Sequence, residues 1–262
     1  MFRLLRFLTI VQWQHIDRDF KGTQVHYQID AKIIMVFLLF TFVLIGLAFF
    51  GMEPAFRFLF GERFRTWRYP GLYSYLYWAS CRVAGYLILP VLVVKFVFRD
   101  PVQEYGVRID RNPRIFLLYF LMLSAVLPGV LWASGAPGFL RTYPFYDQAA
   151  NSWTELLLWE SAYAMQFVAL EFFFRGFVLF SFARHIGAYA IFLMSVPYTM
   201  IHFQKPLPET IGAVIAGVAL GTLALRTRSI LGGVLIHIAV AWSMDLAALW
   251  QKGLLQRLIN QD

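Results

Sequence analysis

Cysteine and charge are both scarce in this chain of 262 residues. The single cysteine, Cys81, cannot form an internal disulfide, and its apolar surroundings in the sequence favour packing over a reactive thiol. Charged residues make up 15% of the chain and hydrophobic residues 60%, whereas a soluble globular protein is about 45–50% apolar. The composition therefore excludes a disulfide scaffold and an ordinary soluble domain.

The chain also lacks alternating hydrophobic patterns and any recognisable nucleic-acid-binding module. Its apolar stretches are continuous, which disfavours a transmembrane β-barrel and favours membrane helices. The net charge is +8, but the basic residues lie between hydrophobic runs and do not cluster on one soluble domain. We expect them to set orientation and to touch membrane lipid headgroups, with no nucleic-acid partner.

The predicted fold is an all-α, polytopic transmembrane helical bundle with about seven spans. The fourth expected span is longer than a bilayer requires, and the fifth and sixth, at about 17 residues each, are barely long enough. Their expected bounds are 33–51, 73–97, 115–133, 153–183, 187–203, 210–226 and 229–250.

Basic residues between the spans predict the orientation. Thirteen Lys and Arg residues fall on the side of the N-terminus and eight on the other side, which favours a cytoplasmic N-terminus. No small-residue cleavage site follows Leu4–Trp13, so this segment reads as an interfacial amphipathic helix, or else as a loosely ordered tail. These features fit a multi-pass protein of a bacterial inner membrane.

The composition shifts near residue 150. Residues 1–150 hold the N-terminal segment, the first three spans and most of the loop charge, whereas 151–262 is compact and holds every motif. We expect a core of four spans with an N-terminal addition.

Polar and charged groups interrupt three of the apolar segments. They are Glu171 with Arg175, His202, and His237 with Asp245. An ionisable group inside a bilayer costs several kcal/mol and normally faces a cavity with a function. A carboxylate, a guanidinium and two imidazoles are also suited to acid–base hydrolysis, so the sequence indicates an enzyme within the membrane.

Each group also has a structural interpretation. Glu171 and Arg175 stack on one helix face, where Arg175 either keeps the carboxylate ionised and aimed at water or simply neutralises it. His202 ends an apolar span and could be an ordinary interfacial residue. His237 is surrounded by apolar residues in the sequence and therefore needs a partner, which favours a functional role.

Three further carboxylates are possible supporting residues. Asp245 lies about 12 Å along the helix from His237, where it could orient a neighbour or sit at the interface. Glu160 lies close to three turns before Glu171, on nearly the same face. Glu209 follows Pro208 and could instead begin the sixth span, where a carboxylate suits the positive end of the helix dipole.

Small residues predict close helix packing at two places. Gly176 lets another backbone approach the Glu171–Arg175 helix. Ala213, Gly217 and Gly221 form a stripe that allows the sixth span to pack tightly on a neighbour.

Three motifs in order resemble the CPBP family (Abi, or type II CAAX prenyl endopeptidase-like) of intramembrane proteases. That family is marked by Glu-Glu-x-x-x-Arg, then Phe-x-x-x-His, then His-x-x-x-Asn, each on a different membrane helix. The corresponding segments here are Leu170–Gly176, Tyr198–His202 and Ser229–His237, and the resemblance covers about residues 150–250. The implied activity is endopeptidase cleavage of membrane-associated or lipidated proteins.

This sequence departs from the family pattern at two positions. Leu170 stands in place of the first Glu, which in the family activates water with a His, and Ala241 in place of the Asn that helps to hold the oxyanion. The resemblance then implies that Glu171 acts as the base, that His202 assists it, and that His237 donates to the oxyanion. Glu160, Glu209 or Asp245 would otherwise substitute for the missing Glu.

Two alternatives remain open at this stage. Two His and one carboxylate are sufficient for a catalytic zinc, but no His-Glu-x-x-His helix is present, so we favour a mechanism without a metal or other cofactor. A catalytically inactive relative that binds a hydrophobic peptide or partner, in an immunity or assembly role, would also explain the two departures.

Overall fold

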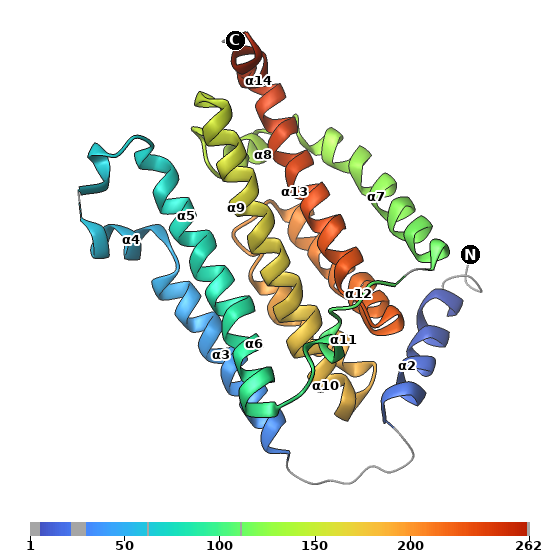
Figure 1. The fold of residues 1–262 in the computed structure, drawn as a ribbon. Helices are drawn as coiled ribbons and strands as arrows, with labels where there is room; N and C mark the ends of the chain where they lie inside the picture. Colours follow the sequence, from blue (N-terminus) through green and yellow to red (C-terminus); the bar gives the residue numbers. More distant parts are fainter. Residues whose placement is uncertain (1–5, 22–29, 62, 111, 261–262) are drawn as a thin grey trace. The chain divides into compact units, whose positions relative to one another are not determined.

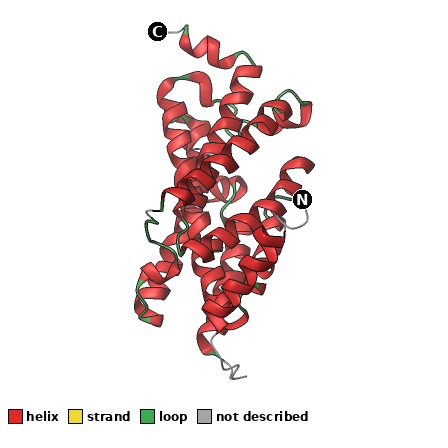
Figure 2. Ribbon diagram, turned by 90° about the vertical axis from the view of Figure 1, so that its right-hand side faces the viewer, coloured by secondary structure: helices red, strands yellow, loops and turns green. Residues whose placement is uncertain are grey.

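The computed structural model describes residues 6–21, 30–61, 63–110 and 112–260. Every regular element in these ranges is helical, with no strand among them (Figures 1 and 2). The longer helices are α2 (Gln12–Lys21), α3 (Ala31–Phe50), α4 (Glu53–Phe60), α5 (Pro70–Val83), α7 (Pro113–Ala133), α9 (Trp153–Glu171), α10 (Leu179–Ile186), α11 (Tyr189–Met200), α12 (Leu207–Thr227) and α13 (Leu231–Gln251). The predicted all-α fold class is confirmed.

Short elements join and extend these helices. Three are short α-helices: α6 (Leu89–Leu92), α8 (Pro137–Thr142) and α14 (Leu254–Ile259). Four are π-helical: η1 (Phe7–Val11), η3 (Ala84–Ile88), η4 (Val93–Phe98) and η7 (Phe172–Val178). Three are 3₁₀ turns: η2 (Arg63–Thr66), η5 (Val102–Tyr105) and η6 (Ala149–Asn151).

Six continuous helical stretches are long and apolar enough to cross a membrane, counted over the described residues. They are Ala31–Phe50, Pro70–Phe98, Pro113–Ala133, Trp153–Ile186, Leu207–Thr227 and Leu231–Gln251. The fourth stretch continues from α9 through η7 into α10 and reaches 34 residues, as its expected length suggested. The chain is therefore an integral membrane protein of the polytopic helical class.

The fifth expected span is shorter than 187–203. Helix α11 has 12 residues, about 18 Å at 1.5 Å per residue, whereas the hydrocarbon core of a bilayer is about 30 Å thick. Pro197 lies inside its last turns, and a series of turns over 201–205 follows before α12 begins. Helix α11 thus lacks the length to cross a bilayer alone.

Contacts between residues group the chain into two compact units. The first comprises Met1–Phe42, Leu89–Arg111 and Glu171–Gly233, and the second comprises Val43–Ile88, Asn112–Leu170 and Val234–Asp262. Each unit is assembled from three separate segments. The expected division near residue 150 stays a prediction.

Close packing of α11 on α12 organises the first unit. A Cβ atom at Gly217 would lie 2.8 Å from Ser195 Oγ, and one at Gly221 would lie 3.3 Å from Ile191 Cγ2. The absence of side chains at these two positions lets the helix backbones approach. The predicted role of the small-residue stripe in packing is confirmed.

The N-terminal helix packs on α10 and α12 within the same unit. Ile16 is fully buried, Trp13 Nε1 donates a hydrogen bond of 3.1 Å to Thr222 Oγ1, and the Asp17 carboxylate accepts one of 2.7 Å from the Ala188 amide. Residues 6–21 are thus helical with one face packed against the protein. The location of this helix at the membrane interface stays a prediction.

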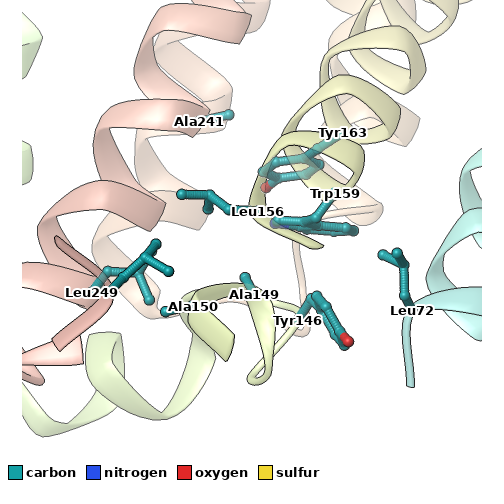
Figure 3. Close-up of a cluster of buried hydrophobic side chains, with 10 residues drawn as sticks. Leu72, Tyr146, Ala149, Ala150, Leu156, Trp159, Tyr163, Ala241 and Leu249 are labelled. Carbon is teal, nitrogen blue, oxygen red and sulfur yellow. The ribbon is translucent and has the colours of Figure 1, made fainter. Parts of the chain in front are cut away.

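An aromatic core organises the second unit (Figure 3). Trp159 and Tyr163 of α9 stack with ring centroids 4.8 Å apart, and Leu156, Ala241 and Leu249 belong to the same buried cluster. Large rings bury much apolar area and favour offset or edge contacts. This cluster joins α9 to α13 within the second unit.

Replacing Gly217 by Ala tests the α11–α12 packing. The new methyl would overlap Ser195, so we expect a loss of about 1–3 kcal/mol of stability and a melting temperature lower by several degrees in detergent. Gly212→Ala on the same helix is the control, because a Cβ there meets nothing within 4 Å. Equal melting temperatures for the two variants would contradict the close contact.

Candidate active site

Glu171 and Arg175 form a fully buried ion pair where α9 passes into η7. They lie four residues apart, so the helix brings both side chains to one face, in the favourable order with Glu first. Arg175 Nη1 donates to Glu171 Oε1, and both side chains have 0% exposure. Removing one partner of such a buried pair typically costs about 3–5 kcal/mol, because the other charge is left buried.

Neighbouring helices of the first unit enclose the Arg175 guanidinium. Its Cζ atom lies 4.3 Å from the centre of the Tyr198 ring of α11, a cation–π contact. Its Nη2 atom lies 3.5 Å from the Ala216 carbonyl oxygen of α12. Arg175 therefore ties η7 to both helices of the α11–α12 pair.

Gly233, in the first turn of α13, lies directly against the Glu171 carboxylate. A Cβ atom at Gly233 would be 2.5 Å from Glu171 Oε2 and 3.2 Å from its Cδ. Any larger residue would therefore displace the carboxylate. Sequence reasoning missed this contact, although Gly232-Gly233 stood inside the third motif segment.

Gly176 accommodates the loop that precedes the third span. A Cβ atom there would lie 2.7 Å from the Tyr105 carbonyl oxygen of η5. The prediction that Gly176 permits close approach of another backbone is confirmed. This loop covers the turn of η7 that follows Arg175.

His202 is connected to the ion pair through Tyr198. The Tyr198 ring packs under Arg175 and lies 4.9 Å from the His202 ring, centroid to centroid. His202 Nδ1 lies 2.8 Å from the Tyr198 carbonyl oxygen, which only accepts hydrogen bonds. The neutral ring thus carries its hydrogen on Nδ1, and Nε2 is an acceptor suited to taking a proton.

The turn after His202 brings the start of α12 back to it. Thr210 Oγ1 donates a hydrogen bond of 2.8 Å to the His202 carbonyl oxygen. Glu209 occupies the first turn of α12, as the dipole argument suggested, and its carboxylate lies 3.4 Å from Lys205 Nζ. A catalytic role for Glu209 stays a prediction.

The first unit therefore brings together Glu171, Arg175 and His202. His237 belongs to the second unit, where its ring stacks on Phe167 with centroids 5.1 Å apart. Phe167 lies one turn before Glu171 on α9, and His237 lies one turn after Gly233 on α13. His237 is thus packed against an aromatic ring of α9, and its functional role stays a prediction.

Asp245 and Glu160 are also in the second unit. The fully buried Asp245 accepts a hydrogen bond of 2.7 Å from Trp159 Nε1, so it orients a neighbouring side chain. Trp242 Nε1 lies 3.2 Å from the Glu160 carbonyl oxygen. Both carboxylate oxygens of Glu160 are buried without a hydrogen-bond partner among the described residues. A supporting role of Asp245 and Glu160 in catalysis stays a prediction.

The two residues that depart from the family pattern are both buried. Ala241 is 4% exposed and belongs to the cluster that contains Leu156, Trp159 and Tyr163. Leu170 is likewise buried. An amide in place of Ala241 would lack obvious partners in that cluster, because its buried neighbours are mainly carbon.

Within the described ranges, no three His, Cys, Asp or Glu side chains lie close enough to hold a metal ion. The zinc alternative needs such a set, so the donor geometry gives it no support. The preference for a mechanism without a metal stays a prediction.

Comparison with known proteins supports the motif assignment. Residues 152–243 match the family model of the type II CAAX prenyl endopeptidase Rce1-like proteins. No curated protein and no solved structure matches the chain. The CPBP resemblance indicated by the three motifs is thus confirmed for this part of the chain, which contains Glu171, Arg175, His202 and His237.

Gly233→Ala tests the contact with the Glu171 carboxylate. The methyl would push Oε2 away from its position, and we expect a loss of about 1–3 kcal/mol in thermal unfolding measurements. Glu171→Asp shortens the side chain by one methylene and so makes room for the new methyl. The double variant Gly233→Ala/Glu171→Asp should therefore lose less stability than the two single variants lose in sum. Strict additivity would show that the two residues do not touch.

Proposed function

We propose that this protein is an intramembrane endopeptidase that hydrolyses peptide bonds of membrane-associated or lipidated proteins. Glu171 acts as general base on a water molecule, which attacks the carbonyl carbon of the peptide bond. The proton that Glu171 takes from the water passes to His202 Nε2, and His202 then gives it to the leaving amine nitrogen as the C–N bond breaks. The family match over residues 152–243 supports the reaction class.

The enclosed Glu171–Arg175 pair is the observation that carries this proposal. Buried ion pairs contribute little net stability compared with apolar residues of similar volume. This pair is nevertheless fully buried in a span, within contact range of Tyr198 and so of His202. A carboxylate held by a guanidinium next to a tautomer-fixed imidazole supports water activation.

His237 enters the proposal from its motif position, as a donor to the oxyanion. The family's Asn donor is replaced by Ala241, and loss of one such donor typically lowers the rate about 10²–10³-fold. The proposed enzyme is therefore a slow one, with substrates that remain near it in the membrane.

A second candidate function is binding without cleavage. The apolar cluster around Ala241 and the buried Leu170 favour it, because both missing polar groups are replaced by apolar packing. Such a protein would hold a hydrophobic peptide or partner on a protease fold. Glu171 and Arg175 would then fix helix packing only.

Three variants, compared with wild type at equal abundance, separate these functions. New protein termini are compared across host membranes carrying wild type, Glu171→Gln, the double variant Glu171→Gln/Arg175→Gln, or Glu53→Gln. The single change leaves Arg175 buried and unpaired, so it destabilises the protein, whereas the double variant removes both charges and restores stability. An enzyme loses its termini in both variants that lack Glu171.

Glu53 is the matched control, because it forms an exposed pair with Arg57 at 2.7 Å with the same spacing of four residues. Glu53→Gln should leave the set of termini unchanged. If wild type generates no termini of its own, or if the stable double variant keeps them all, Glu171 has no catalytic role. The binding function would then be the better description.

A further inference from the structure

A basic pocket lies in the first unit, and neither Glu171 nor His202 is among its lining residues. Its cavity volume is about 280 Å³, and its lining residues are Gln103, Glu104, Arg108, Arg184 and Arg228. Three guanidinium groups thus face one depression. They come from the loop after η5, the last turn of α10 and the residue that follows α12.

The backbone around the pocket is closely packed. The Ile230 amide donates a hydrogen bond of 2.9 Å to the Gly106 carbonyl oxygen, and Ser229 Oγ donates to that of Arg108. Gly106 has a φ of +84°, and a Cβ atom there would lie 2.8 Å from Ile230 Cγ2. The loop carrying Arg108 is therefore held against the residues that follow α12.

Among the described residues, one of the three arginines is paired with carboxylates and the other two form no ion pair. Arg184 is paired with Glu104 at 2.8 Å and with Asp100 at 3.5 Å. Arg108 and Arg228 form no ion pair with any described carboxylate. The pocket therefore holds three guanidinium groups and one carboxylate, that of Glu104, which is paired with Arg184.

Arg228 is held near the other two arginines of the pocket, Arg108 and Arg184. Its Cζ atom lies 3.8 Å from the centre of the Phe20 ring, and its backbone has a φ of 54°, which costs energy for any residue with a Cβ. Burial and the nearby charges of Arg108 and Arg184 lower the pKa of Arg228, whereas Asp19 opposes the shift. A bound anion would relieve this repulsion.

The position of the pocket in the chain points to a lipid. Arg228 directly follows the span Leu207–Thr227, and Arg184 lies two residues before the end of the span Trp153–Ile186. Val107 and Ile109, on either side of Arg108, are 41% and 71% exposed. Apolar side chains exposed beside arginines at the ends of spans fit the boundary between acyl chains and headgroups.

We propose that this pocket binds the phosphate of an anionic phospholipid headgroup, with Arg108 and Arg228 as its main ligands. Guanidinium groups match phosphate oxygens in pairs, so three of them around one cavity recognise a phosphate better than a diffuse positive surface does. This site is independent of the proposed peptidase function.

Native mass spectrometry of the purified, delipidated full chain tests the proposal. The protein is titrated with phosphatidylglycerol, with phosphatidylcholine, and with inorganic phosphate. Wild type should retain phosphatidylglycerol over phosphatidylcholine, and Arg108→Gln/Arg228→Gln should weaken its retention about tenfold or more. The control Arg63→Gln/Arg257→Gln removes two exposed arginines elsewhere and should retain the lipid as wild type does.

A charge-preserving variant separates a pocket from a charged surface. Arg108→Lys/Arg228→Lys should still lose several-fold in retention, because Lys cannot make paired hydrogen bonds to phosphate. Full retention by this variant, equal retention of both lipids, or loss with the control variant would overturn the pocket. Binding of inorganic phosphate without preference for phosphatidylglycerol would overturn the lipid as its ligand.

Discussion

The buried contact between Glu171 and Arg175 is the constraint on which the rest of the first unit depends. A pair of opposite charges with no exposed surface requires protein on every side, and three elements supply it. Tyr198 of α11 covers the guanidinium, Ala216 of α12 offers it a carbonyl oxygen, and Gly233 makes room for the carboxylate. Gly233 is therefore a consequence of that pair, whereas Gly217 and Gly221 serve the packing of α11 on α12.

Much of this arrangement could be predicted from the sequence, because it depends on local geometry. Span positions follow from length and hydropathy, and the Glu171–Arg175 pair follows from a spacing of four residues on a helix. The packing roles of Gly176 and Gly217 also follow, since a glycine inside an apolar helix usually marks a close approach. Each of these predictions uses residues that are close to one another in the sequence.

The other contacts depend on which helix surfaces pack against each other. That pairing is determined by residues far apart in the sequence. Gly233 lies 62 residues from the carboxylate it touches, and no local pattern pairs the two. The apolar cluster around Ala241 depends on aromatic residues of α9, about 80 residues earlier. The short α11 was also hard to foresee, because its sequence is apolar enough for a full span.

The two departures from the family pattern, Leu170 and Ala241, both belong to the second unit. Ala241 lies within an aromatic cluster of the second unit, so its apolar character is matched by its neighbours and is consistent with stable packing. The Glu171–Arg175 pair has no such explanation, since apolar residues of similar volume would be as stable or more so. Stability alone therefore accounts for Ala241 in place of the family's Asn, but not for the presence of the Glu171–Arg175 pair. The ion pair either takes part in catalysis or selects one packing of η7 against α11 and α12. Only catalysis needs the Glu171 carboxylate itself, because packing can be kept when both side chains are neutral.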